Sequence, residues 1–199
     1  GVAALGAAVA TAVGALWGGA AGALGGRVEA ALMRVVDAVL GVPRVLLLLA
    51  VVALWGAVPA PALAVILGLT AWPATARLVR ARLAQVRGAE FVQAARALGA
   101  SPARVALRHL PPHAAGTVAV SATLLFGELL ALEAGLSFLG LGVRPPDASW
   151  GSMVQDGTPY VADAPWTALV PTACIVVSVL CASVLGDYLA ERARPGVGG

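Results

Sequence analysis

Residues 90–112 read EFVQAARALGASPARVALRHLPP, and this compact stretch between two strongly apolar halves decides how the chain is organised. Its first nine residues place apolar side chains at the spacing of a single helix face, namely Phe91, Ala94, Ala95 and Leu98. Residues that recur at i, i+3, i+4 and i+7 lie on one side of an α-helix. The pattern therefore predicts a short first helix with one apolar face.

The second half of the stretch predicts another short helix that follows at once. Gly99 suits the end of the first helix, because a glycine readily adopts the left-handed conformation found there. Ser101 followed by Pro102 is typical of a helix start. The second helix must end near His109, because Pro111 has no N–H group to continue it. We expect two helices joined by a rigid bend.

Composition places this stretch in a membrane protein. The chain has 199 residues, of which 60% are hydrophobic and 12% charged, and its mean hydropathy is +0.90. A soluble domain of this length carries about twice that charged share. A basic helix-turn-helix for a DNA groove is the alternative interpretation of residues 90–112. The apolar halves argue against it, so we expect an all-α polytopic membrane protein without a nucleic-acid partner.

Five membrane spans are predicted, over residues 1–26, 36–57, 60–78, 113–134 and 166–187. Residues 1–26 carry no charge, and their glycines recur every four residues, which favours close packing against another helix; a pore-lining role is the alternative. Residues 45–76 are also uncharged, and the sequence VPAPA at 58–62 suggests a hairpin turn at 58–61. The hairpin puts every arginine except Arg144 on the side of residues 90–112, which predicts that this side is cytoplasmic.

Individual charges near the spans have separate predictions. We expect Arg44 to reach the membrane interface with its long side chain. Arg77, Arg80 and Arg87 are interpreted, with Arg82, as a cytoplasmic anchor rather than as partners of particular acids. Glu128 lies deep in its span, so its side chain should face protein or an aqueous path. The alternative is a functional role for Glu128 as part of a proton relay. Glu133 lies near the outer end, where it reaches water or a neighbour.

Residues 135–165, GLSFLGLGVRPPDASWGSMVQDGTPYVADAP, form the outer connection. Repeated Gly and Pro exclude one long helix, while Leu136 and Phe138 are too apolar for open water. We expect the segment to lie along the interface or to fold over the bundle. Trp150, Tyr160 and Trp166 suit the aromatic belt of a membrane protein.

Several stretches resemble the permease subunits of bacterial ABC importers. Gln93-Ala94-Ala95, Gly99 and Leu110-Pro111-Pro112 resemble the cytoplasmic "EAA" loop of these subunits. LSFLGLGVRPPDASWGSM at 136–153 and the stretch at 165–189 resemble the C-type permease of dipeptide, oligopeptide and nickel importers, as does RVEAALMRVVDAVLGVP at 27–43. The resemblance implies one permease domain over 1–199 with the type I ABC importer fold, holding five of six expected spans because the amino-terminal helix is absent.

The resemblance also implies a function and a set of partners. The chain would form half of a translocation pathway for peptides, related small solutes or nickel in the bacterial inner membrane. Its partners would be ATP-binding subunits, a paralogous permease and an extracytoplasmic solute-binding protein. ATP hydrolysis would belong to those subunits, so we expect no enzyme activity, cofactor or metal in this chain. The alternative is a proton-coupled secondary transporter that uses Glu128.

Two groups of site residues follow from the resemblance. Loop 79–112 would couple the chain to an ATPase through Glu90, Phe91, Gln93, Ala94, Ala95, Leu98, Gly99, Ser101, Pro102, His109, Leu110 and Pro111. The outer segment 135–165 would face the binding protein through Leu136, Phe138, Gly140, Pro145, Pro146, Trp150 and Gly151. The chain departs from the family pattern at Gln93, where Glu is typical, at Pro111, where Leu is usual, and at Glu128, where a small residue is expected.

Overall fold

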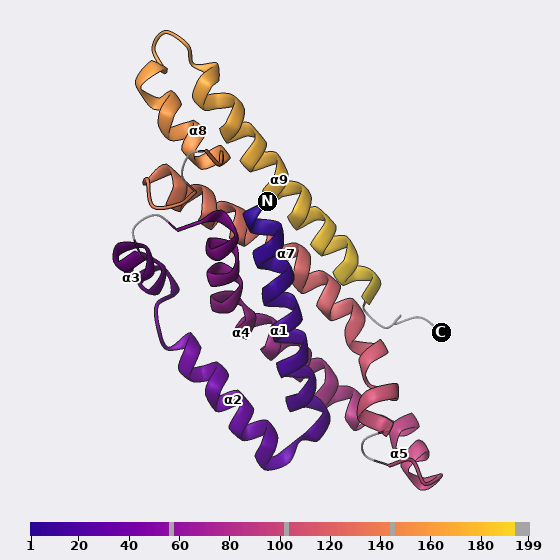
Figure 1. The fold of residues 1–199 in the computed structure, drawn as a ribbon. Coiled ribbons are helices and arrows are strands. Elements are labelled where there is room, and N and C mark those ends of the chain that lie inside the picture. Colours follow the sequence, from indigo (N-terminus) through magenta and orange to yellow (C-terminus); the bar gives the residue numbers. More distant parts are fainter. Residues whose placement is uncertain (56–57, 102–103, 144–145, 194–199) are drawn as a thin grey trace.

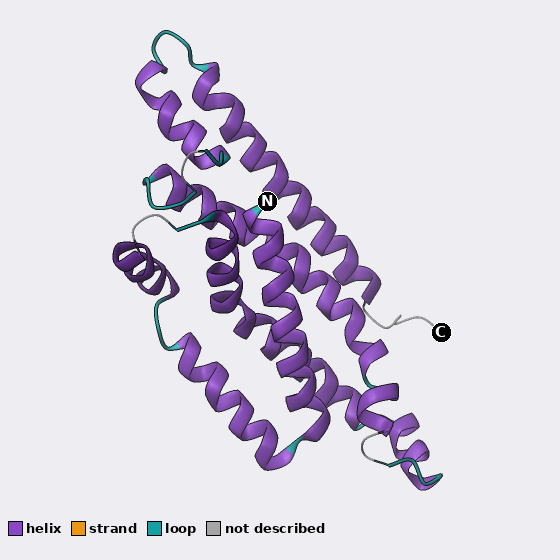
Figure 2. Ribbon diagram, in the orientation of Figure 1, coloured by secondary structure: helices purple, strands orange, loops and turns teal. Residues whose placement is uncertain are grey.

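The computed structural model describes residues 1–55, 58–101, 104–143 and 146–193, and all regular structure within these ranges is helical (Figure 2). This confirms the all-α prediction. The elements are α1 (Val2–Leu24), α2 (Gly26–Leu40), α3 (Arg44–Trp55), α4 (Ala60–Arg87), α5 (Glu90–Ala97), the π-helix η1 (Val105–His109), α7 (Pro111–Phe138), α8 (Trp150–Gly157), the 3-10 helix η2 (Thr158–Tyr160) and α9 (Trp166–Ala193).

Among the described residues, four helices are long and apolar enough to cross a membrane, namely α1, α4, α7 and α9. The pair α2 and α3 makes a fifth crossing if the two count as one bent span. The prediction of one helix over 36–57 is wrong, because the chain bends by 66° between α2 and α3. Pro43 lies in the break, and a proline both lacks an N–H group and disfavours a helical residue before it.

Helices α1 and α4 lie side by side and run in the same direction (Figure 1). A Cβ atom placed on Gly6 would lie 3.0 Å from the Ala64 carbonyl oxygen, and one on Gly22 would lie 2.7 Å from Leu83 Cβ. The glycine repeat of α1 is therefore a packing ridge, as expected for helices that approach closely in lipid. Because α1 and α4 are parallel, the α2–α3 arm between them must return across the bundle.

Helices α7 and α9 complete the bundle, with α7 antiparallel to both α4 and α9. The hydroxyl groups of Thr75 and Ser121 lie 2.6 Å apart and join the middle of α4 to α7. Gly127 of α7 faces Ala182 of α9. Helices α5 and α8 mark opposite ends of the bundle, which we call the α5 end and the α8 end (Figure 1).

Two apolar clusters hold these elements together. The larger one joins α1, α4 and α7 and includes Leu48 and Val52 of α3. The smaller one lies at the α5 end and consists of Val79, Leu83, Val86, Val92, Val105, Leu110 and Ala114. The segment 90–112 is therefore packed onto the bundle by a core of its own.

Candidate functional site

Helix α4 carries the predicted coupling segment beyond the apolar part of the bundle. It continues without a break through the buried Pro73 to Arg87, past the predicted end of its span at 78. A turn at Gly88 then leads into α5. Val92 of α5 and Val105 of η1 are buried in the smaller cluster, so both short elements are fixed to the extended end of α4. Sequence reasoning missed Val92, because it considered only the other apolar face of α5.

That other face is largely presented to the surroundings. Leu98 is 89% exposed and Phe91 is 44% exposed, while Ala95 is half-buried. The Phe91 ring lies against the His113 ring, with 5.0 Å between their centroids. The Gln93 side-chain amide donates a hydrogen bond to the Gly88 carbonyl oxygen at 3.1 Å, so this residue stabilises the start of its own helix. Glu90 and Ala94 are also exposed.

The bend after α5 has the predicted conformation. Gly99 has φ of 86°, which is strained for any residue with a side chain, and the Ala100 N–H donates to the Ala95 carbonyl oxygen. Ser101 Oγ accepts a hydrogen bond from the Arg104 N–H at 3.2 Å. Pro102 and the side chain of His109 lie outside the described residues.

The element after this bend is a π-helix rather than the expected α-helix. It covers Val105–His109 and ends at the buried Leu110. Pro111 then becomes the first residue of α7, a position where the missing N–H costs nothing. The predicted break before the prolines is thus confirmed, and α7 begins two residues earlier than the expected span.

Three arginines of α4 pair with carboxylates of α2, so their interpretation as a simple anchor is wrong. Arg80 Nε donates to Glu29 Oε1 at 2.5 Å, and Arg87 Nη2 lies 3.5 Å from Glu29 Oε2. Arg77 Nη2 lies 2.5 Å from Asp37 Oδ1. Glu29 is buried, and a buried carboxylate requires such partners. The paired charges of α2 and α4 are at least 40 positions apart in sequence, so spacing alone could not pair them.

Arg87 also connects the end of α4 to α1. Its Nη1 donates to the Gly22 carbonyl oxygen at 3.2 Å, in the last turn of α1, where carbonyl groups lack helical partners. Together with Glu29, Arg87 therefore ties α1, α2 and α4 together at the α5 end.

Arg44 contacts the middle of α4 and the inner part of α7, which corrects its predicted place at the membrane interface. Its Nη1 is 2.5 Å from Glu128 Oε1 of α7, and its Nε donates to Thr70 Oγ1 of α4 at 3.2 Å. The intramembrane carboxylate Glu128 thus has a cationic partner from a segment 84 positions away. Glu133 is different: it is buried and accepts a hydrogen bond from Ser137 Oγ at 2.7 Å.

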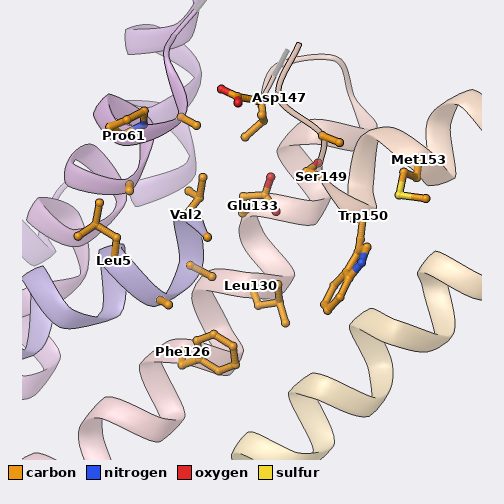
Figure 3. A pocket seen from close by; sticks show the side chains of 17 residues that line it. Val2, Leu5, Pro61, Phe126, Leu130, Glu133, Asp147, Ser149, Trp150 and Met153 are labelled. Atoms are coloured by element: carbon orange, nitrogen blue, oxygen red, sulfur yellow. The ribbon is translucent and has the colours of Figure 1, made fainter. Parts of the chain in front are cut away.

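A pocket of about 650 Å³ opens at the α8 end between the first turns of α1 and α4, the last part of α7, and α8 (Figure 3). Phe126 and Leu130 form part of its apolar wall, while Glu133 and Asp147 supply carboxylates. Trp150 lines the opposite side from the first turn of α8. The outer segment therefore folds over the bundle, one of the two arrangements expected from its sequence.

The predicted residues of the outer segment have different surroundings. Leu136 is buried, and Gly151 packs directly on the Ala134 backbone. Phe138 and Pro146 are exposed. The turn after α7 includes Gly140 with φ of 74°, and Pro145 lies outside the described residues. The short helix α8 was not anticipated; Ser149 and Ser152 form a capping box at its start.

The chain is similar in sequence to known proteins. A family model described as "Binding-protein-dependent transport system inner membrane component" matches residues 11–195. The chain belongs to this family. Its members are inner-membrane components of binding-protein-dependent transport systems.

Individual relatives agree with the family. A protein of Brucella ovis named as a peptide permease is 40% identical over 201 residues, which cover 98% of this chain and 65% of the relative. The oligopeptide transport system permease protein OppC of Salmonella typhimurium is 37% identical over 131 residues, which cover 66% of this chain and 43% of OppC. The permease chain thus spans 65% of the length of the first relative and 43% of the second.

A solved structure supports the fold. The MetNI methionine ABC transporter in inward-facing conformations matches with a TM-score of 0.65 at 19% identity, covering 96% of this chain and 94% of that one. The expected type I ABC importer transmembrane fold is thereby confirmed.

Proposed function

We propose that this chain is the permease subunit that forms half of the translocation pathway of an ABC importer for peptides or related small solutes. Residues 1–199 would act as one permease domain, with loop 79–112 coupling it to an ATP-binding subunit. The names of the Brucella ovis and Salmonella typhimurium relatives favour peptides as the substrate class. Nickel complexes are the second class to test, because the outer segment resembles permeases for both.

The observation that carries the coupling proposal is the construction of the α5 end. Val92 anchors α5 in the core, while Leu98 and Phe91 present apolar surface on its outer side. A loop without such an anchor would deform when a partner displaces it. A helix packed on the core transmits the displacement to the element against which it packs. That element is α4, one continuous helix of 28 residues. An ATP-binding subunit that grips α5 would therefore move α4 as a rigid body.

The contacts at the same end would spread this displacement. Glu29 joins α2 to Arg80 and Arg87 of α4, and Arg87 reaches the last turn of α1. Leu110 continues the small cluster into the start of α7. The proposed sequence of events is that closure of the ATP-binding subunits shifts α5, and that α4, α1 and α7 follow together. Alternating access would then arise between this bundle and a paralogous permease.

The opposite end of the bundle is the proposed dock for an extracytoplasmic solute-binding protein. Helix α8 and the turn after α7 project there, beside the pocket lined by Trp150 and Asp147. Trp166 and Tyr160 are exposed nearby on the same segment. Substrate released from the binding protein would enter the bundle at this end.

The competing function is proton-driven transport through Glu128. In the structure, Glu128 forms an ion pair with Arg44, a fixed contact with a neighbouring segment. Replacing Glu128 with Gln separates the two functions. The secondary transporter is favoured if the parent protein shows no ATP-dependent uptake and Glu128→Gln abolishes a proton-driven current. ATP-dependent uptake that is retained in Glu128→Gln would exclude it.

Cross-linking tests the coupling proposal in the full-length permease assembled with its ATP-binding subunits. Cys174 and Cys181 are first replaced by alanine, and Leu98→Cys is compared with Leu139→Cys, which is 64% exposed at the α8 end. We expect a short bifunctional reagent to join Leu98→Cys, but not Leu139→Cys, to an ATP-binding subunit. Absence of that product with Leu98→Cys would refute the contact. Uptake of labelled peptide and of a nickel chelate in the same vesicles would identify the substrate class.

A further inference from the structure

One face of α7 is left uncovered by the other helices. Glu128, Ala131 and Gly135 recur along it at i, i+3 and i+7, and all three are exposed. A Cβ atom placed on Gly135 would meet nothing within 4 Å. The sides of α7 that hold Ser121 and Gly127 are directed at α4 and α9 instead. The uncovered face is therefore a distinct surface, and Glu128 is its one charged member.

Glu128 is placed on this face together with Arg44 of α3. The two side chains form the 2.5 Å ion pair, and the Glu128 side chain is still 58% exposed. Thr70 holds the Arg44 guanidinium from the other side, while its own hydroxyl donates to the Leu67 carbonyl oxygen at 2.9 Å. Arg44 Nη2 has no hydrogen-bond partner among the described residues. The pair is thus held from three helices without being saturated.

The pair lies near the middle of the membrane. Thr70 is about 15 Å along the helix from the start of α4, and Glu128 is about the same distance from the end of α7, at 1.5 Å per residue. Both helices begin or end there at the α8 end. This is half of a hydrocarbon core of about 30 Å. An exposed carboxylate at that depth is unfavourable against lipid and is normally found facing a protein neighbour or water.

Helix α9 provides the contrast at the same depth. Gly127 of α7 faces Ala182, and the opposite side of α9 at this level exposes Leu180 and Val184. No charged residue occurs in α9 before Asp187. The outward face of α9 therefore suits lipid, whereas the uncovered face of α7 does not.

We infer that the uncovered face of α7 lines the water-filled pathway, and that Arg44 and Glu128 form a charge pair on its wall that contacts the charged groups of the passing substrate. The inference rests on the proposed function and names a site for it. A peptide with free termini carries an ammonium group and a carboxylate. Glu128 offers an acceptor to the ammonium group and Arg44 a donor to the carboxylate. Because the pair has no net charge, it can exchange partners with a zwitterion without trapping ions of one sign.

Thiol reactivity tests the position of the face. In the full-length transporter with Cys174 and Cys181 replaced by alanine, Ala131→Cys and Gly135→Cys are treated with a hydrophilic, membrane-impermeant methanethiosulfonate. Leu180→Cys and Val184→Cys are the matched controls. Such reagents attack the thiolate, which forms in water and not in lipid. We expect the α7 variants to react at least about tenfold faster than the α9 variants in the nucleotide-free or the ATP-trapped state. Equally slow reaction in both states would overturn the inference.

Transport by charge-neutral variants tests contact with substrate. Glu128→Gln should raise KM about tenfold for a peptide with a free amino terminus, the effect of losing one charge-assisted hydrogen bond, and leave its N-acetylated form unaffected. Arg44→Gln should do the same for a free carboxyl terminus against its amide. If the pair only supports the fold, the single variants would lower assembly for all substrates alike and the double variant would restore uptake, which would overturn the contact.

The proposed coupling through α5 and the proposed pathway face of α7 can be refuted separately. Cross-linking through Leu98→Cys with unreactive α7 thiols would refute the pathway assignment and leave the coupling intact. Reactive α7 thiols without any ATP-binding subunit bound at α5 would refute the coupling and leave an aqueous face.

Discussion

Replacing a single glycine in the α1 ridge should loosen the bundle, and the chain offers a matched control in the same helix. Gly14 is buried against α4, where a Cβ atom would lie 2.5 Å from Thr75 Cβ and 2.7 Å from the Trp72 carbonyl oxygen. A Cβ atom on Gly19 would meet nothing within 4 Å. We therefore expect Gly14→Ala to destabilise the permease relative to Gly19→Ala.

The size of the effect follows from these distances. Carbon atoms pack at about 3.5–4.0 Å, so Gly14→Ala forces α1 and α4 apart by about 1 Å. Inserting one methyl group into a well-packed contact costs about 1–3 kcal/mol. The preference of alanine over glycine for a helix is common to both variants and cancels in their difference. The free energy of unfolding should thus differ by about 1–3 kcal/mol, or about 5- to 150-fold in the unfolding equilibrium.

Sodium dodecyl sulfate titration of the purified full-length permease in mild micelles measures this difference, with helical circular dichroism as the signal. Gly14→Ala should unfold at a lower fraction of dodecyl sulfate than Gly19→Ala. Equal transitions for the two variants would refute the argument that α1 is fixed by direct contact with α4. The result bears on transport, because α1 follows α4 only if the ridge is tight.

Three further predictions concern the ends of the bundle. Gly99→Pro or Ala95→Trp should uncouple ATP hydrolysis from uptake while membrane insertion, followed by protease protection, stays normal; proline cannot adopt the positive φ at 99, and unchanged uptake would contradict the docking of α5. Glu29→Gln should weaken the contacts of Glu29 with Arg80 and Arg87 at the α5 end by about 1–3 kcal/mol, because the carboxylate charge is lost and one acceptor oxygen becomes an NH2 donor; a double-mutant cycle with Arg80→Gln in the same titration should give a coupling energy, and strict additivity would exclude this interaction. Ser149→Ala should destabilise α8 by about 1 kcal/mol through loss of its capping box and raise amide exchange there, whereas exchange equal to that of the parent would deny the cap a role.

Short-range sequence signals predicted much of the structure of the coupling segment, residues 79–112. Gly99, Ser101 and Pro111 act within a few residues of themselves, so their effects on the backbone depend little on the rest of the fold. The same holds for the apolar length of α1, α4, α7 and α9. The break at Pro43 is also a local signal, but the uncharged run that follows it was the stronger pattern and led to one span where the structure has two helices.

Contacts between distant segments needed the tertiary structure. Arg44 could be expected at an interface or in the bundle, and only the packing of α3 beside α4 and α7 brings it to Glu128. The sequence did not distinguish Val92 from other apolar residues of the segment. The structure shows that it packs in the smaller cluster with residues of α4 and η1.

The sequence by itself determined that the chain is a helical membrane protein, where α1, α4 and α9 begin to within a residue, and which residues make the bend after α5. Only the tertiary structure decided which charges pair and which faces stay open, because a helix face is assigned by the neighbours it meets and these come from parts of the chain that composition and spacing cannot bring together.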